Sequence, residues 1–357
     1  MAVCCLAIAA ASIPAGAFIN CDQTSTLTRP IDLGVSGGNI NSFGGSGRHR
    51  FCFSGTLGSM VQDSSNSQYI LSNNHVLADI NKAKSGQLIV QPGLVDTAPP
   101  CTKTPGDAVA MFSRTVKIKF GHGTNTIDAA IALITPGDVN SDILNIGAIA
   151  SSVVDPTVGL AVQKMGRSTC VTSATISAVS MNGTINYGGG KKAKFVNQIV
   201  IDGNFSTPGD SGSLIVTQDT CPQAVGLLFA GGMDQNGTPV TIANPISAVL
   251  SGLNVTMVGG CTAAAVSSAP TSNVLAGDAG MSKDAVASAA SVRDRHEDEL
   301  MRIPGAVGTA VGASDQPGQP AIIVYVKKVT PEVQAAAPKE VEGVPVKLIQ
   351  NSGFVAY

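Results

Sequence analysis

One short string in this sequence has the residue types and spacing of a nucleophilic site. Ser211 lies in Gly209-Asp210-Ser211-Gly212, where the flanking glycines let the backbone bend sharply and leave the hydroxyl unobstructed. A Ser hydroxyl is a weak nucleophile, so it needs a base and a group that orients the base. Gly209 also permits backbone N–H groups to converge on a developing oxyanion. The string therefore predicts nucleophilic catalysis by Ser211.

Candidates for the base and its orienting group stand earlier in the chain. His75 follows the apolar run 69–71, at the point where a predicted strand turns. Asp128 begins the apolar segment 128–134, which would bury its side chain. A buried carboxylate needs a hydrogen-bonding partner, and a His N–H would provide one. We therefore expect the His75 and Asp128 side chains to lie together near Ser211.

The elements that must position these residues are short strands separated by turns. Between about residues 31 and 254, apolar runs alternate with Gly, Asn, Asp and Ser, a pattern typical of a β-sandwich or barrel. The predicted strands include 69–71, 87–90, 108–112, 171–180 and 195–201. Residues 245–253 are expected to form one short helix.

The composition changes after this β-rich part. Residues 262–280 are rich in Ala, Ser, Thr and Gly, which is typical of a flexible linker. Residues 281–357 predict a small α-β-β-α-β domain, and its charged run 293–299 is expected to face solvent. The predicted elements are a helix at 282–302 capped by Ser282, strands at 305–312 and 321–327, a helix opened by Thr330, and a strand at 344–350 that ends the unit.

Charge and composition exclude several classes of function. The chain of 357 residues has a formal net charge of −2, with 13% charged and 4% aromatic residues. Such a chain is neither a basic nucleic-acid binder nor an aromatic stacking platform. Its hydrophobic content of 44% is sufficient for a buried core, and its 40 glycines suit many turns. We expect a compact β protein with no nucleic-acid partner.

The N-terminal residues and the cysteines indicate export. Residues 1–17 are apolar and end in Ala15-Gly16-Ala17, as in a signal peptide, although no Lys or Arg stands at the start. A buried N-terminal strand is the alternative. No second segment predicts a membrane span, so none is expected in the mature chain. Of the eight Cys, six remain after this segment, an even number that favours disulfides in a secreted or periplasmic protein.

The order His75, Asp128, Ser211 and the GDSG string resemble the chymotrypsin/trypsin-like serine peptidase superfamily. The resemblance covers residues 30–258, and within the superfamily the sequence is most similar to a bacterial and plant branch. The motifs of that branch stand here at 72–78 (SNNHVLA), 209–214 (GDSGSL) and 226–232 (GLLFAGG). It implies a mainly β fold of two six-stranded antiparallel β-barrels, at about 30–150 and 155–258, with the small C-terminal α+β domain beside them.

The resemblance also implies the chemistry. Ser211 would be the nucleophile, His75 the general base and then acid, and Asp128 the group that orients the imidazolium. The backbone N–H groups of Gly209 and Ser211 would form the oxyanion hole. The chain would be a serine endopeptidase that hydrolyses protein or peptide substrates through an acyl-enzyme, with no cofactor and no metal. No CxxC or Cys/His cluster in the sequence suggests zinc.

The same resemblance can be extended to specificity and to one disulfide. It places Phe205 at the base of the substrate pocket, and this uncharged pocket would favour small or medium apolar side chains. The opposite wall would comprise Leu228, Phe229, Ala230 and Gly231. Cys170 and Cys221 each precede strands expected to be neighbours in the second barrel, so a Cys170–Cys221 disulfide is expected, with two unpaired thiols as the alternative.

The sequence differs from the digestive enzymes of this superfamily in how the enzyme would be activated. Digestive relatives pair the Asp before the nucleophile, here Asp210, with a freed N-terminal Ile or Val. No basic cleavage site followed by such a residue precedes the barrels, which predicts activity without zymogen cleavage.

Other hypotheses remain open at this point. The chain could be a catalytically inert, peptidase-like binding scaffold, or an enzyme limited to self-cleavage, for example within 262–280. Residues 281–357 could form an independent module, bind a partner, or cover the active site as an inhibitor. The sequence leaves the natural substrate and the oligomeric state undecided.

Overall fold

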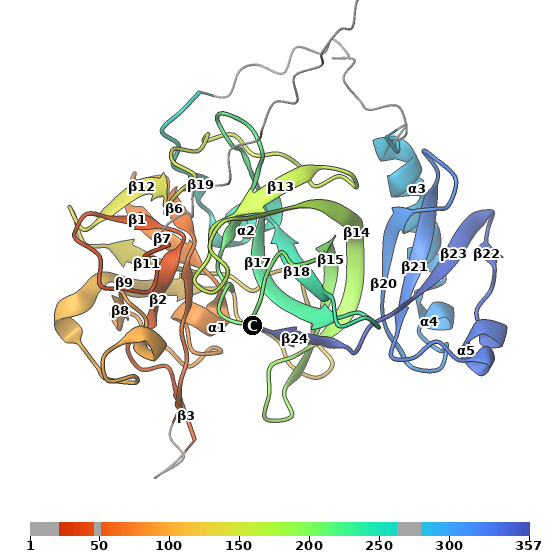
Figure 1. Cartoon of the computed structure of the whole chain (residues 1–357), viewed down its shortest axis with the longest axis horizontal. Helices are drawn as coiled ribbons and strands as arrows, with labels where there is room; N and C mark the ends of the chain where they lie inside the picture. The colour runs from red at the N-terminus through yellow and green to blue at the C-terminus, as the bar shows by residue number, and fades with distance from the viewer. Residues whose placement is uncertain (1–20, 46–50, 263–279) are drawn as a thin grey trace, which may run out of the picture.

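A computed structural model describes residues 21–45, 51–262 and 280–357 (Figure 1). The predicted signal peptide at 1–17 lies outside the described residues, as does the predicted linker apart from its two ends. The described chain is mainly β, with curled sheets.

The first curled sheet is antiparallel and is built mainly from the N-terminal half of the chain. Its strand order is β19-β6-β7-β11-β9-β8-β2-β5. These strands are β2 (Val35–Asn39), β5 (Gly55–Leu57), β6 (Ser59–Gln62), β7 (Gln68–Ser72), β8 (Leu88–Val90), β9 (Ala108–Thr115), β11 (Ala130–Ile134) and β19 (Thr256–Met257). Small pairs are β1 (Ile31–Leu33) with β12 (Val139–Ile143), and β3 (Phe43–Gly44) with β4 (Phe51–Cys52). Helix α1 (Asn74–Leu77) and 3₁₀ helices at Leu94–Asp96 and Pro105–Asp107 complete this part.

The second sheet begins with the strands of the C-terminal half of the β-rich region. They are β10 (Thr124–Asn125), β13 (Ala161–Lys164), β14 (Thr172–Asn186), β15 (Lys192–Asp202), β16 (Leu214–Thr217), β17 (Ala224–Met233) and β18 (Pro239–Pro245), followed by helix α2 (Ile246–Leu253). Their order is β10-β15-β18-β17-β16-β13-β14, and β14 also pairs with β15, so the sheet curls onto itself.

The main core lies between the two sheets. Strand residues alternate between faces, so Leu71 of β7 enters this core while Ile70 packs inside the first sheet. Leu214 and Leu227 approach from the second sheet, and α2 contributes Ile246 among others. Because one core joins both sheets, the loops at their shared edge are held at fixed positions. This architecture confirms the prediction of a chymotrypsin-like β fold.

The C-terminal part extends the second sheet rather than starting a separate one. Strand β20 (Ala306–Ala313) pairs antiparallel with β14, and the order continues β20-β21-β23-β22. The remaining elements are α3 (Lys283–Arg295), α4 (Glu297–Leu300), β21 (Pro320–Val326), α5 (Pro331–Ala336), β22 (Glu340–Val341), β23 (Val344–Gln350) and β24 (Phe354–Ala356). Figure 1 shows these elements beside β14, with β24 returning toward the centre of the molecule.

Three expectations for this C-terminal part were wrong in detail. The single predicted helix is divided into α3 and α4 at His296, although Ser282 does cap it by accepting from the Ala285 N–H. The predicted solvent-facing run 293–299 is exposed or half-buried except at Arg293, which is 3% exposed and donates to the carbonyl of Ser180 on β14. The unit does not end at 344–350, because β24 follows and pairs with both β14 and β17.

The predicted Cys170–Cys221 disulfide is also wrong. The structure pairs Cys21 with Cys170, Cys52 with Cys101 and Cys221 with Cys261. Cys170 precedes β14 and Cys221 precedes β17, and β13 and β16 lie between those two strands. Neighbouring strands are about 4.8 Å apart, so strands three positions apart are beyond the reach of a disulfide.

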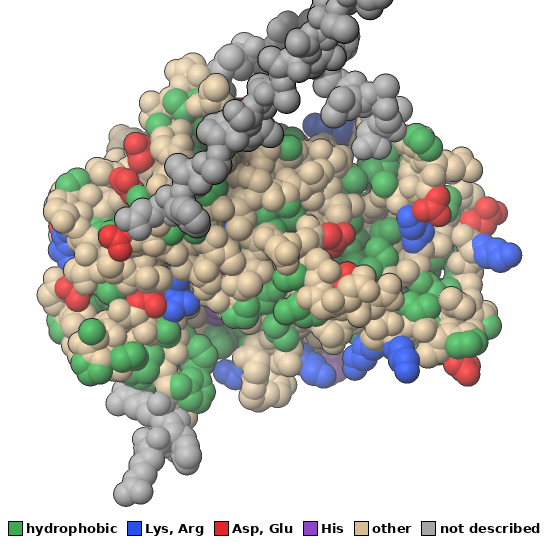
Figure 2. Space-filling view, viewed as in Figure 1, with side chains coloured by type: hydrophobic (Ala, Val, Ile, Leu, Met, Phe, Trp, Pro, Cys, Tyr) green, Lys and Arg blue, Asp and Glu red, His purple; other side chains and the backbone are tan. Residues whose placement is uncertain are grey.

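The surface carries few charges of either sign. On the face in Figure 2, acidic and basic side chains are scattered and form no continuous basic surface. Among the described helices, none is long and apolar enough to cross a membrane.

Candidate active site

The register of two strands brings His75 and Asp128 together. Ser72 at the end of β7 lies opposite Ala130 at the start of β11, so the residues beyond each strand end are neighbours. His75 Nδ1 lies 2.7 Å from Asp128 Oδ2. Asp128 is fully buried, and its Oδ1 accepts the backbone N–H of Asn74 at 2.7 Å. The carboxylate is therefore held on the imidazole by the first turn of α1.

Tyr187 is a site residue that the sequence analysis missed. It follows β14, and its hydroxyl donates to Asp128 Oδ2 at 2.7 Å. Its ring packs edge-on against the His75 imidazole, with centroids 6.0 Å apart. Burial and the charge of Asp128 raise the pKa of Tyr187 well above its ordinary value, so the hydroxyl remains a donor. No motif marks this tyrosine, which stands before three glycines in a hairpin loop.

Ser211 lies on the tight loop that the sequence predicted. Gly209 and Gly212 have φ values of +105° and +95°, which a side chain would disfavour. The Ser211 hydroxyl donates to the carbonyl of Phe229 at 3.1 Å. Within the described residues, the N–H groups of Gly209 and Ser211 donate to no protein acceptor. Two amide donors are thus available beside the hydroxyl.

Asp210, directly before Ser211, is anchored by a buried lysine. Its Oδ1 accepts the Ser168 N–H at 2.8 Å, and its Oδ2 accepts the Thr169 hydroxyl at 2.8 Å. Lys164 Nζ lies 3.7 Å from Asp210 Oδ2, and both side chains are fully buried. Burial lowers the pKa of Lys164 to about 8, while the charge of Asp210 acts in the opposite direction. Lys164 is therefore the cation that pairs with Asp210 directly before the proposed nucleophile.

The residues predicted to line the substrate pocket are only partly brought together. Phe205 and Leu228 are fully buried in one apolar cluster, which also includes the half-buried ring of Tyr357. Phe229 and Ala230 belong to a different cluster, and the Phe229 ring packs on Phe195 with centroids 4.8 Å apart. Phe229 and Ala230 border the site through their main chain, since the Phe229 carbonyl accepts the Tyr357 N–H and Ala230 pairs with Ala356, while their side chains pack in the other cluster. Gly231 does lie against the Tyr357 ring.

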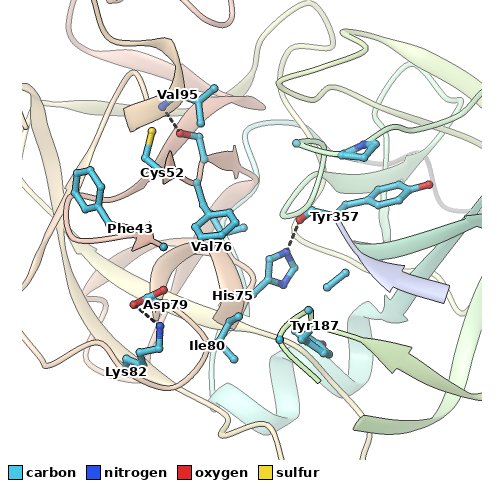
Figure 3. A pocket seen from close by; sticks show the side chains of 18 of the residues that line it. Phe43, Cys52, His75, Val76, Asp79, Ile80, Lys82, Val95, Tyr187 and Tyr357 are labelled. Atoms are coloured by element: carbon cyan, nitrogen blue, oxygen red, sulfur yellow. Dashed lines mark hydrogen bonds and ion pairs between the residues drawn. The ribbon is translucent and has the colours of Figure 1, made fainter. Parts of the chain in front are cut away.

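The C-terminal residues occupy the same site. The carbonyl oxygen of Tyr357 lies 2.9 Å from His75 Nε2, as the dashed line in Figure 3 shows. No hydrogen bond joins Ser211 and His75 in the described part of the chain, since each has another partner. A cavity of about 440 Å³ adjoins this point, and its lining includes His75, Tyr187 and Gly209.

The described residues, 21–45, 51–262 and 280–357, contain no group of three His, Cys, Asp or Glu side chains arranged to hold a metal ion. The contact of Asp128 with His75 Nδ1 is the arrangement by which a carboxylate orients an imidazole for proton transfer.

Comparisons with solved structures return bacterial serine proteases. A glutamic acid specific serine protease that uses a histidine triad in substrate binding is 20% identical, with a TM-score of 0.44. Thermobifida fusca Protease A is 16% identical with a TM-score of 0.41, and Cellulomonas bogoriensis chymotrypsin is 17% identical with a TM-score of 0.39. Each match covers 64% of this chain and 100% of the other. No family model and no curated protein matches the chain. At these identities and TM-scores, likeness identifies no activity, and function must be inferred from the side chains.

Proposed function

We propose that this protein is a serine endopeptidase that hydrolyses peptide bonds through an acyl-enzyme. The observation that carries this proposal is the buried His75–Asp128 pair at 2.7 Å, beside the glycine-flanked Ser211 loop. A buried carboxylate on a His nitrogen fixes the tautomer that a general base requires. An inert binding scaffold would have no need for this buried charge, which costs free energy unless it is paired.

The proposed reaction uses the chain's own groups in each step. His75 Nε2 takes the Ser211 proton as Oγ forms a bond to the substrate carbonyl carbon. The N–H groups of Gly209 and Ser211 stabilise the oxyanion. His75 then returns the proton to the amine as the C–N bond breaks, which leaves the acyl-enzyme. Water repeats the sequence and releases the carboxylic acid and Ser211.

Activity at an extracellular or periplasmic location is part of the proposal. Disulfides persist in oxidising compartments and are rare in the cytosol. The three disulfides join segments up to 149 residues apart in sequence, which supports a fold completed after export.

Incubation with a peptide library, followed by mass spectrometry of the products, tests the proposed function. The proposal is supported if the wild-type chain, or a chain shortened to Phe354, cleaves peptides at defined bonds. The same two chains with Ser211→Ala should cleave none. Absence of cleavage by both folded wild-type forms would overturn it.

A second candidate function is hydrolysis limited to the chain itself. The contact of the Tyr357 carbonyl with His75 favours it, because this contact places the main chain of the same molecule at the proposed base. Intact masses that are identical in the wild-type and Ser211→Ala proteins would eliminate self-cleavage.

Tyr187 is expected to position Asp128 during turnover. Tyr187→Phe removes a hydrogen bond to a charged group, and such bonds contribute about 1.5–3 kcal/mol. We expect kcat to fall about tenfold or more with KM nearly unchanged, because the tyrosine orients the base rather than binding substrate. The matched control is Tyr69→Phe. It removes the 2.8 Å hydrogen bond from the hydroxyl of Tyr69, on β7, to Asp63, in the turn before β7. Equal effects of both variants on kcat would contradict a positioning role.

A further inference from the structure

Residues 354–357 bind along β17 as an added strand. Ala356 lies opposite Ala230 and Val355 opposite Gly231 in an antiparallel pair. The N–H of Tyr357 donates to the Phe229 carbonyl at 3.3 Å, and that carbonyl also accepts the Ser211 hydroxyl. An extended segment added to a sheet edge is a common way for proteins to hold peptides. The main chain of the tail is thus aligned beside the proposed nucleophile.

The tail also covers the proposed catalytic groups. The Tyr357 carbonyl is the partner of His75 Nε2 at 2.9 Å, while Nδ1 contacts Asp128. Both ring nitrogens of His75 are therefore occupied by partners from the same chain. Ser211 is 0% exposed, so no solvent reaches it while the tail is in place. A second peptide could not take the same place without displacing Tyr357.

The Tyr357 side chain fills an apolar pocket with a polar base. Its ring belongs to the cluster of Phe205 and Leu228 and passes over Gly231, where a Cβ would lie 2.0 Å from the Tyr357 hydroxyl. Burial raises the pKa of Tyr357 to about 12, with the charge of Asp210 adding to this and a hydrogen bond to Ser206 opposing it. Ser206 is itself 2.6 Å from the Thr241 hydroxyl. This pocket therefore accommodates the ring of a phenol, with the Ser206 hydroxyl near its oxygen.

We propose that the tail, residues 354–357, is an internal ligand that inhibits the site. The tail also indicates the substrate class: peptides with an aromatic residue, and Tyr above all, on the acyl side of the cleaved bond. The assignment of substrate rests on the proposed serine endopeptidase function. It replaces the expectation of small or medium side chains, because Gly231 leaves room for a ring beside Phe205.

The C-terminal module explains how the tail is held in place. Phe354 is 2% exposed and packs edge-on against Tyr325 of β21, with centroids 5.6 Å apart. The Ser352 N–H donates to the Met233 carbonyl at 3.0 Å. Because the module is joined to β14 through β20, the tail is presented intramolecularly at a high effective concentration. Val355, in contrast, is 41% exposed, so a chain that ends at Phe354 loses no buried side chain at position 355 and keeps the packed phenylalanine.

Binding in trans tests occupancy without any turnover. The probe is the peptide acetyl-Gly-Phe-Val-Ala-Tyr, titrated into a Ser211→Ala chain that ends at Phe354 and so retains the packed phenylalanine. We expect this chain to bind the peptide at least tenfold more tightly than the full-length Ser211→Ala chain, whose site is filled. A matched peptide ending in Asp should bind at least tenfold more weakly than the Tyr peptide. Equal binding to both chains would overturn internal occupancy.

Hydrolysis then tests inhibition and substrate class. The chain shortened to Phe354 and the full-length Tyr357→Gly variant, which retains the backbone, should each cleave Val-Ala-Tyr anilide at least tenfold faster than wild type. Ser206→Ala in the shortened chain should lower kcat/KM for Val-Ala-Tyr anilide about threefold to tenfold relative to Val-Ala-Phe anilide, because Ser206 acts on the Tyr hydroxyl, which Phe lacks. An equal loss of kcat/KM on the Tyr and Phe substrates, or a higher kcat/KM for a substrate with Ala in that position, would overturn the assignment of aromatic substrates.

The two proposals fail in different ways. If the shortened chain binds the Tyr peptide but cleaves no substrate, the endopeptidase function is wrong and the tail remains a ligand of a binding site. If full-length and shortened chains cleave at equal rates, the tail does not inhibit, although the enzyme function stands.

Discussion

Ser211→Ala is expected to abolish peptide hydrolysis, with kcat lowered on the order of 10⁶-fold. Loss of a catalytic serine typically has this effect, because only the oxyanion donors and substrate binding then remain. The measurement is the rate of Val-Ala-Tyr anilide cleavage by the chain shortened to Phe354. The same Ser211→Ala change should leave the free energy of unfolding almost unaltered, since it removes one neutral hydrogen bond to Phe229.

The matched control lies two residues further along the chain. Ser213 is fully buried like Ser211, and its hydroxyl has no hydrogen-bond partner among the described residues. Ser213→Ala should therefore retain kcat within about threefold, because it removes no group from the reacting atoms. A shortened Ser211→Ala chain that still cleaves at more than a hundredth of the wild-type rate would contradict the assignment of Ser211 as nucleophile.

Lys164→Met is expected to destabilise the fold by about 3–5 kcal/mol and to lower kcat/KM at least a hundredfold. Removal of one partner from a buried ion pair leaves the other charge uncompensated, which costs about this much free energy. That charge is on Asp210, which is 0% exposed and directly precedes Ser211. A shift of Asp210 would misplace the N–H donors of Gly209 and Ser211, and loss of one such donor typically costs 10²–10³ in rate. Urea unfolding and anilide hydrolysis measure the two effects.

Two further variants test whether loss of the Lys164–Asp210 ion pair causes the destabilisation. Lys164→Met combined with Asp210→Asn should be more stable than Lys164→Met alone, because the second change removes the stranded charge. Lys347→Met is the surface control: Lys347 and Asp315 form an exposed pair at 2.8 Å, whose loss should cost under about 1 kcal/mol. Equal destabilisation by the Lys164 and Lys347 variants would show that the buried pair has no special role.

The same lysine predicts a loss of activity at alkaline pH. Burial lowers the pKa of Lys164 to about 8, so the ammonium is present at pH 7 and is lost as the pH rises through about 8. Asp210 then lacks its cationic partner. We expect kcat/KM of the shortened chain to fall above pH 8, and Lys164→Arg, if it folds, to extend the active range because Arg stays protonated. An unchanged alkaline limb in a folded, active Lys164→Arg chain would contradict this origin.

The local features of the site could be predicted from the sequence. The glycines around Ser211 require special backbone angles, and the structure gives positive φ at Gly209 and Gly212. The apolar alternation of β7 and β11 predicted strands at the right places. Their register, with Ser72 opposite Ala130, depends on packing on both faces of the sheet and could not be predicted from the sequence of either strand alone. The apolar run after Asp128, which predicted burial of its carboxylate, supplied the pairing with His75, and the family resemblance agreed with it.

The features that were missed depend on contacts between distant segments. Tyr187 meets Asp128 across 59 residues, and Lys164 meets Asp210 across 46, without any motif that joins them. Tyr357 meets His75 across 282 residues, and this contact depends on β20 joining β14. The disulfide error has the same origin, because the strand order, rather than the spacing of cysteines, decides which pairs are within reach.

The most direct test of the central claim is labelling with a fluorophosphonate, which reacts only with an activated serine. The chain shortened to Phe354 is treated with the probe and digested, and the labelled residue is located by mass spectrometry. We expect one label per chain, on Ser211, and none after His75→Ala, which removes the proposed base. A folded shortened chain that takes up no label on Ser211 would contradict the account and identify the protein as an inert, peptidase-like scaffold.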